Sequence, residues 1–285
     1  MTLEISLQEG ILHISQSSFS ADFPLTGSGE SYADCGHFFT VGCLNVDGHH
    51  NSNLDGVNME GKAVIQRRKT SCHRSLCPKC WQDWANRETD KAVQRLKSFS
   101  LKGRNLKPIH VVVSVPHVDY GLDLPSMRKK VYRVLKNVHM LGGMMIYHSK
   151  RKRKNGSEWY FSPHFHIIGY GWLTDIHRNY VYSGYLIKNI GVRKRVGGVI
   201  YYQLSHAGIS ENHHTVTWFG CLSYGKLHVK YRKDDPVVCP LCRNRLHQLL
   251  WIGKGDPELL DVEGITFYDD PSNWIYRPMK RWNDD

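Results

Sequence analysis

The chain has 285 residues, of which 41% are hydrophobic, so it can bury the core of one large domain or of a catalytic domain with appendages. Its net charge of +12 favours a polyanionic partner, nucleic acid first and a membrane surface second; a basic protein without such a partner is the alternative. No run of about 18 apolar residues occurs and the N-terminus lacks a signal-peptide pattern, so we expect a soluble, cytoplasmic protein that does not enter a membrane.

The cysteines are clustered and mixed with histidines at short spacings, which in a reducing compartment indicates zinc rather than disulfides. Short strands are expected at 3–7 and 11–14, before the first cluster. Cys77 and Cys80 then form a C-x2-C knuckle, with Cys72 upstream, a spacing typical of a zinc site. The fourth ligand must come from elsewhere in the chain, and the candidates are Cys35, Cys43 and, as a third choice, His73.

The middle of the chain alternates between helical and extended patterns. Apolar residues recur at three-to-four spacing over 81–99, which predicts a helix with one charged face. A central strand is predicted at 109–115, and a second helix at 126–141. The pair Gly142-Gly143 is expected to end that helix, and a strand is predicted at 144–148.

A run of five cations follows, and an Asn-Gly hairpin turn signal at 155–156 separates it from an aromatic strand at 159–171. The order strand, helix, strand, hairpin, strand predicts an antiparallel sheet with helices on one face, an α+β layer fold. The cations, together with a second basic step downstream, are expected to track DNA phosphates, with a solvated face as the alternative. They are Lys150, Arg151, Lys152, Arg153 and Lys154, and then Arg193, Lys194 and Arg195.

Two histidines on the aromatic strand carry the strongest chemical signal. His164 and His166 are two residues apart, so on a strand they point to the same face, while Phe165 and Ile167 point to the other face and can be buried. Two imidazoles side by side make half of a metal site; two polar residues on a solvated face are the alternative.

The histidine pair needs at least one further ligand. Glu158 has the same strand parity and would suit Mg²⁺ or Mn²⁺, and His148 on the neighbouring strand competes with it. The sequence contains no H-E-x-x-H helix of the metalloprotease kind. A weakly held Mg²⁺ or Mn²⁺ that acts on a phosphate therefore fits this basic protein best.

The third part of the pattern is a tyrosine pair on a predicted helix at 197–208, after a loop at 173–179 and a strand at 180–190. Tyr202 lies opposite the apolar face of that helix, with polar residues beside it at the next turn, and Tyr201 lies between the two faces. A tyrosine near a metal-bound phosphodiester can attack it and form a phosphotyrosine link, which stores the bond energy for rejoining.

A second knuckle, Cys239 and Cys242 with Cys221 upstream, is similar to a zinc ribbon with three cysteines; a reduced pair in a loop is the alternative. Its fourth ligand is expected among the histidines His228 and His247, with His213 and His214 more remote. These patterns predict a zinc-binding region at 1–104, a catalytic domain at 105–212, and a zinc-ribbon-like region with a tail at 213–285.

The chain resembles, at three places, the HUH endonucleases that initiate rolling-circle replication. Their three motifs correspond, in chain order, to 109–115, to His164-Phe165-His166 and to the Tyr201/Tyr202 helix. A cysteine knuckle also precedes the first motif. This knuckle and the sequences of 162–171 and 202–208 look most like those of the Rep proteins of archaeal plasmids and viruses.

The resemblance covers roughly residues 72–220. It implies a ferredoxin-like palm, a catalytic Mg²⁺ or Mn²⁺ with structural Zn²⁺, and nicking and rejoining of single-stranded origin DNA through one tyrosine. Host helicase and polymerase would be partners. The family's third motif places a lysine three residues after the tyrosine, and here Ser205 stands there, followed by His206. The shared face with those two residues favours Tyr202 over Tyr201.

Two other functions are compatible with the sequence. A transposase or mobilisation relaxase of the same superfamily would use the same chemistry. A zinc-dependent nucleic-acid-binding regulator without catalysis would make the histidine pair and the tyrosine helix a coincidence.

Overall fold

The computed structural model describes residues 23–50, 53–54, 56–100, 106–153, 158–210, 212–231, 237–257 and 264–277. The chain divides into two compact units: unit 1 combines 1–31 with 73–231, and unit 2 combines 32–72 with 232–285. This division differs from the three contiguous regions predicted above, because the two ends of the chain contribute strands to one sheet in unit 2. The strands expected at 3–7 and 11–14, and Lys154, lie outside the described residues.

Unit 1 is built on a five-stranded sheet in which every pair of neighbouring strands is antiparallel. The strand order is β8-β5-β7-β6-β9, which places β7 in the middle of this sheet. The strands are β5 (Ile109–Ser114), β6 (Met140–Lys152), β7 (Trp159–Gly171), β8 (Leu186–Val192) and β9 (Val216–Gly220). The predicted α+β class with an antiparallel sheet is confirmed.

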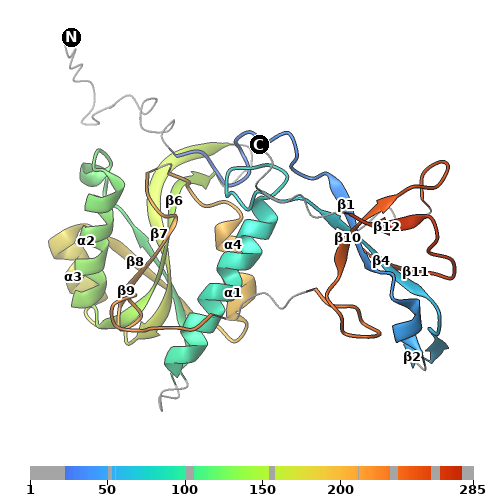
Figure 1. The fold of residues 1–285 in the computed structure, drawn as a ribbon. Helices are drawn as coiled ribbons and strands as arrows, with labels where there is room; N and C mark the ends of the chain where they lie inside the picture. The colour runs from blue at the N-terminus through green and yellow to red at the C-terminus, as the bar shows by residue number, and fades with distance from the viewer. Residues whose placement is uncertain are drawn as a thin grey trace, which may run out of the picture. The chain divides into compact units, whose positions relative to one another are not determined.

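Helices cover both faces of this sheet, not one (Figure 1). The helices of unit 1 are α1 (Trp81–Ser100), α2 (Leu124–Asn137), α3 (Ile176–Ser183) and α4 (Val196–Leu204). On β6, Met145 and Tyr147 pack with α2, whereas Met144 and Ile146 pack with α1 and α4. A central strand that is apolar on both faces must be covered on both, which explains the correction.

None of the helices that the structure describes is long and apolar enough to cross a membrane. The helix α1, the longest, carries charges on one side, as its sequence predicts.

The glycine pair predicted to end a helix lies inside β6 instead, and α2 already ends at Asn137. A Cβ on Gly142 would lie 2.6 Å from the backbone nitrogen of Cys221 and 2.7 Å from the carbonyl oxygen of Phe219. The pair therefore reflects the close approach of the β9 backbone, not the end of a helix.

The segment predicted as a loop and a strand over 173–190 is also different. It forms α3 and then β8, with Gly184 at the helix C-terminus in a left-handed conformation at φ 72°. The aromatic residues Tyr180 and Tyr182 suggested a strand, but both are exposed on the helix. The helix packs instead through Ile176, which contacts the core on the α2 side.

Unit 2 contains a second antiparallel sheet with the order β11-β4-β1-β10-β12. Its strands are β1 (Phe38–Cys43), β4 (Ala63–Lys69), β10 (His247–Trp251), β11 (Ile265–Tyr268) and β12 (Trp274–Tyr276). A 3₁₀ helix, Val46–His49, and a small hairpin of β2 (Asn53–Leu54) and β3 (Val57–Asn58) lie between β1 and β4. Because β1 pairs with β10, residues far apart in sequence meet in this unit.

Candidate functional site

Three histidines meet on the face of the unit 1 sheet that α1 and α4 cover. His148 on β6 lies directly opposite His164 on β7, and His166 follows on the same strand. One ring nitrogen from each lies within 4.8 Å of the others, so the three could hold one metal ion. Phe165 and Ile167 point to the other face and are fully buried, as their alternation predicts.

Hydrogen bonds fix the orientation of the two β7 imidazoles. Nδ1 of His164 lies 2.8 Å from the carbonyl oxygen of Ser162, which can only accept, so this nitrogen carries the proton. Nδ1 of His166 lies 2.9 Å from Nε2 of His110 on β5. When His166 donates in that pair, Nε2 of both β7 histidines is left with a free lone pair. Such outer partners are typical of histidines that bind metals.

The third imidazole has a buried nitrogen that needs a partner. His148 hydrogen-bonds through its ring to the carbonyl of Gln203, and its Nε2 is buried with no partner among the described residues. An unpaired buried nitrogen costs free energy, and a metal ion would satisfy it. The three residues therefore fit a divalent ion by donor type, spacing and orientation.

Burial keeps these imidazoles neutral, which is the form that binds a metal. Burial lowers the pKa of His164 to about 3, and the positive charge of Arg151 adds to the effect. Burial also holds the pKa of His148 and of His166 well below the usual value, and the neighbouring imidazoles act in the same direction.

The structure does not bring Glu158 to this group. Its side chain is exposed and pairs with Arg153 at 3.3 Å. Glu158 shares strand parity with His164 but precedes it by six positions, which on an extended chain is about 20 Å. Strand parity predicts the face of the sheet on which a side chain lies but not its position along the strand. The third member of the histidine group is therefore His148 and not Glu158.

The two tyrosines on α4 have different surroundings. Tyr202 is 63% exposed, and its ring lies 4.8 Å from the ring of His206, centroid to centroid. The His206 ring in turn lies 4.6 Å from that of His148. Tyr201 packs instead against Trp81, within the core between the helices and the sheet. Tyr202 is therefore the tyrosine that is both accessible and connected to the histidine group.

Cationic side chains lie close to the histidines. Arg151 donates to the hydroxyl of Ser114 at 2.7 Å, and its charge acts on His164. On the other side of the group, burial lowers the pKa of His110 to about 4, and the charge of Arg193 acts in the same direction. Positive charge therefore flanks the group from β6 and from the segment after β8.

The β6–β7 hairpin also pairs cations with aromatic rings. Lys152 lies over the ring of Trp159 at 5.5 Å, and Arg153 lies over that of Tyr160 at 5.7 Å. The Trp159 ring lies 6.3 Å from that of His206. The hairpin therefore leads from an exposed cationic and aromatic surface to the histidine group.

Unit 2 holds a second candidate metal centre, made of Cys43, His49, Cys239 and Cys242. Nε2 of His49 lies 3.5 Å from Sγ of Cys43 and 3.3 Å from Sγ of Cys239, and the Sγ atoms of Cys43 and Cys242 are 3.7 Å apart. A tetrahedral zinc ion sets edges of about 3.6 Å between nitrogen and sulfur and about 3.8 Å between sulfurs. The four residues thus fit a structural zinc ion.

The orientation of His49 supports this fit, since its Nδ1 lies 2.6 Å from the carbonyl oxygen of Lys62 and must donate to it. The predicted partners of this knuckle were wrong: Cys239 and Cys242 meet Cys43 and His49 in place of Cys221 and His228. Cys43, a candidate for the first knuckle, belongs here. The pairing of β1 with β10 brings Cys43 to the second knuckle, and its spacing to a histidine, C-x5-H, was the available signal.

The first cysteine cluster is divided between the units, and each half is described in its own unit. In unit 2, Cys35 precedes β1 and Cys72 follows β4, at the same end of this strand pair. There the backbone N–H of Gly36 donates to the carbonyl of Thr70 at 3.0 Å. Strand pairing therefore places the two thiol-bearing residues at one end of a rigid hairpin.

In unit 1, Cys77 and Cys80 are buried in the turn that begins α1, where the N–H of Trp84 donates to the carbonyl of Cys80 at 3.2 Å. His73, the third-choice ligand, is exposed. With Cys43 in the other centre, Cys35 remains as the fourth thiol predicted for this knuckle.

Comparisons of the chain with protein-family models, with curated proteins and with solved structures find no match.

Proposed function

We propose that unit 1 is a metal-dependent endonuclease that nicks single-stranded DNA and rejoins it, with Tyr202 as the nucleophile. The observation that carries the proposal is the contact series from Tyr202 through His206 to His148, which connects an exposed phenol to a three-histidine group. An ordinary solvated face would not bury three oriented imidazoles beside an exposed tyrosine.

The chemistry follows from these positions. A Mg²⁺ or Mn²⁺ ion bound by His148, His164 and His166 would polarise a phosphodiester and neutralise part of its charge. The Tyr202 oxygen attacks phosphorus and loses its proton to solvent, while the bond from phosphorus to the 3′-oxygen breaks and that oxygen takes up a proton from solvent. The products are a 5′-phosphotyrosine and a free 3′-hydroxyl. Attack by that hydroxyl, or by another, reverses the step and rejoins the strand.

The topology of unit 1 supports this proposal. The segment β5-α2-β6-β7-α3-β8 follows the order strand, helix, strand, strand, helix, strand, and its strands lie in the order β8-β5-β7-β6. We infer that this segment is a ferredoxin-like palm of the HUH kind. The histidines then lie on the neighbouring strands β6 and β7, and α4 brings the tyrosine to the opposite face from α2 and α3.

Charge and aromatic rings supply a path for the DNA strand. Arg151 lies near the histidine group, and the Lys152–Trp159 and Arg153–Tyr160 pairs extend from it along the hairpin. Cations would follow phosphates while exposed rings stack on bases, as in other proteins that bind single strands. The positive charge on the segment after β8 would hold the strand on the other side of the group.

The two cysteine-rich centres are proposed to bind structural Zn²⁺. One would use Cys35, Cys72, Cys77 and Cys80, and the other the three cysteines and one histidine of unit 2. All eight ligands are thiols or an imidazole, without a carboxylate or an open position of the kind that catalytic zinc uses. Their contribution would be to folding and to presenting a surface to DNA.

We further propose that the biological role is initiation of rolling-circle replication, with a host helicase and polymerase as partners. A transposase or relaxase would use the same site, and a replicon-maintenance assay separates these roles.

The experiment is adduct formation on labelled single-stranded DNA in the presence of Mn²⁺, analysed on a denaturing gel. The wild type should form a covalent protein–DNA product, and Tyr202→Phe should lose it. The matched control is Tyr201→Phe, which removes a hydroxyl from the neighbouring residue and should keep the adduct. His164→Ala should lose the adduct together with the metal.

An adduct that persists in Tyr202→Phe and is lost in Tyr201→Phe would overturn the assignment of the nucleophile. Failure of the wild type to form an adduct with a full set of origin-derived strands would overturn the endonuclease, and a zinc-dependent DNA-binding protein would remain.

A further inference from the structure

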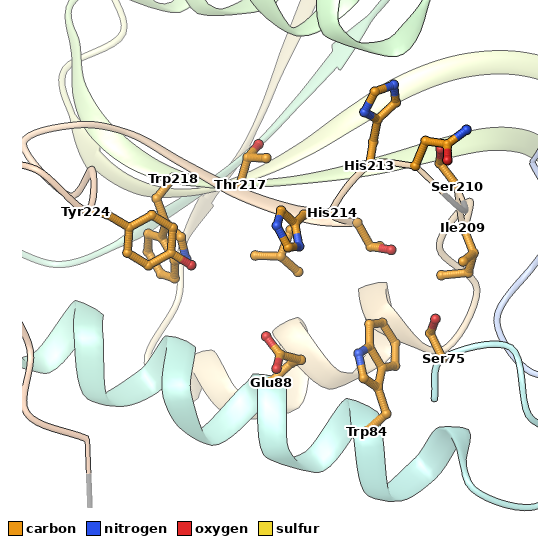
Figure 2. Close-up of a pocket in the computed structure, with 13 residues that line it drawn as sticks. Ser75, Trp84, Glu88, Ile209, Ser210, His213, His214, Thr217, Trp218 and Tyr224 are labelled. Atoms are coloured by element: carbon orange, nitrogen blue, oxygen red, sulfur yellow. The ribbon is translucent and has the colours of Figure 1, made fainter. Parts of the chain in front are cut away.

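A cavity of about 640 Å³ lies in unit 1 between α1 and the segment that leads from α4 through β9. Figure 2 shows Trp84 and Glu88 pointing from α1 into the space below His214, with Trp218 and Tyr224 side by side at one end. The volume is in the range of small-ligand sites. None of the residues identified above as metal ligands or nucleophile lines this cavity.

A buried arginine holds the aromatic end of the cavity in place. Arg95 is 1% exposed, and its guanidinium carbon lies 4.5 Å from the ring of Tyr224 and 5.3 Å from that of Trp218. The same guanidinium donates to the carbonyls of Leu222 at 2.8 Å and Leu227 at 2.6 Å. The two rings are therefore fixed on a rigid support, and a planar ligand would meet a preformed surface.

The polar groups of the cavity favour a neutral ligand with N–H donors. Among the described residues that line it, none is a lysine or an arginine, although the protein as a whole carries +12. Glu88 supplies the one carboxylate of that lining, and its Oε1 is bonded to Lys91 at 2.9 Å. The carboxylate oxygens can only accept, so they would bind an amino or imino group and offer no donor to a phosphate.

The cavity lies on the same side of the sheet as the histidine group. Val216, which lines the cavity, pairs with Ile146 on β6, and Ile146 pairs with His166 on β7. The three residues form a row across the sheet, so two strand spacings, roughly 10 Å, separate the backbone at the cavity from the backbone at the metal group. A DNA strand on the metal group could therefore place a nearby base in the cavity.

We propose that this cavity binds one unpaired base of the DNA strand, and that it selects a base with an amino group, guanine first. This inference rests on the proposed endonuclease function and adds the substrate's sequence preference to it. The Watson–Crick edge of guanine offers two adjacent N–H donors to the Glu88 carboxylate. Thymine offers one N–H between two carbonyl oxygens, which the carboxylate repels. The Trp84, Trp218 and Tyr224 rings supply stacking for either base.

The test is the affinity of the wild type for two fluorescent oligonucleotides without added metal, so that neither is cut. One is a short thymidine oligonucleotide, and the other carries a single central guanosine. The wild type should bind the second at least about fivefold more tightly. In Glu88→Gln this ratio should fall close to one, while binding of the all-thymidine strand stays the same or strengthens.

The matched control is Asp90→Asn, which removes a carboxylate from an exposed position of the same helix and should keep the ratio of the wild type. A second variant, Trp84→Leu, should weaken binding of both strands, and its folding is checked by circular dichroism. Equal wild-type affinity for the two strands, or an unchanged ratio in Glu88→Gln, would overturn the base site alone. A wild type that binds neither strand would overturn the proposed function itself.

Discussion

His148 and His164 face each other across β6 and β7, with ring centroids 5.1 Å apart. Because neighbouring strands are held by backbone hydrogen bonds, this pair is set by the register of the sheet and needs no ligand to form. His166 lies on the same face and supplies the third nitrogen donor on this rigid surface. A site of this kind can accept a weakly bound ion without first paying the entropy of ordering loops.

The first prediction separates the two residues that compete for the third ligand position. His148→Ala should weaken Mn²⁺ binding by more than about 100-fold, because it removes a donor that the sheet holds in place. Glu158→Gln should leave the affinity unchanged, because that carboxylate pairs with Arg153 on the exposed hairpin. Isothermal titration with Mn²⁺ measures both. Loss of binding in Glu158→Gln with retention in His148→Ala would reverse the ligand assignment.

The second prediction concerns His110, which hydrogen-bonds His166 but belongs to neither the ligands nor the tyrosine helix. His110→Ala should weaken Mn²⁺ binding by about 10- to 100-fold, since the His166 ring loses the partner that orients it. His110→Gln places an amide group near the position of Nε2 and should recover part of the affinity. If both variants bind like the wild type, His110 does not orient the site.

The local sequence pattern was sufficient to predict the histidine strand and much of the secondary structure of unit 1. Period-two alternation placed His164 and His166 on one face and Phe165 on the other, as the structure has them. Parity could not decide between His148 and Glu158, because it carries no information about distance along the strand or about the partner strand's register. That register depends on the whole β6–β7 pairing.

Pairing between strands that are far apart in the chain explains which features could not be predicted from the sequence. Cys43 joins Cys242 because β1 pairs with β10, and no local spacing connects those strands. The Gly142-Gly143 pair was misleading for a similar reason, since its cause is the backbone of a distant strand. Aromatic residues on α3 mimicked a strand because β-propensity depends on the packing surface more than on the residue itself.

The third prediction concerns pH and a buried carboxylate away from the metal group. Asp119 accepts hydrogen bonds from Lys130 at 2.5 Å and from the hydroxyl of Tyr185 at 2.6 Å. Burial alone would raise its pKa, but these two bonds outweigh burial and hold the pKa below the usual 3.8. The native state therefore binds the proton less readily than the unfolded chain, so this stability is present above pH 3.8 and is lost as the pH falls further.

Asp119→Asn should accordingly lower the free energy of unfolding by about 1–3 kcal/mol at pH 7. The difference from the wild type should shrink as the pH is lowered below 3.8, because the wild type then loses the same interaction. Urea unfolding of unit 1 at the two pH values measures this. A difference that stays constant with pH would show that the ionised carboxylate contributes nothing.

The last prediction tests the metal centre of unit 2 against the partners expected from the sequence alone. His49→Ala or Cys239→Ser should lower the zinc content by about one ion per chain, because each removes one of four ligands that pack at tetrahedral spacing. The unfolding free energy of unit 2 should fall by about 3 kcal/mol or more, since binding of a structural metal contributes directly to folding. The matched control is Cys221→Ser, a cysteine of unit 1 that should leave the zinc content unchanged. Elemental analysis after gel filtration in a mild chelator gives the zinc content. Loss of zinc in Cys221→Ser, with zinc retained in His49→Ala, would restore the ligand set first expected from the sequence.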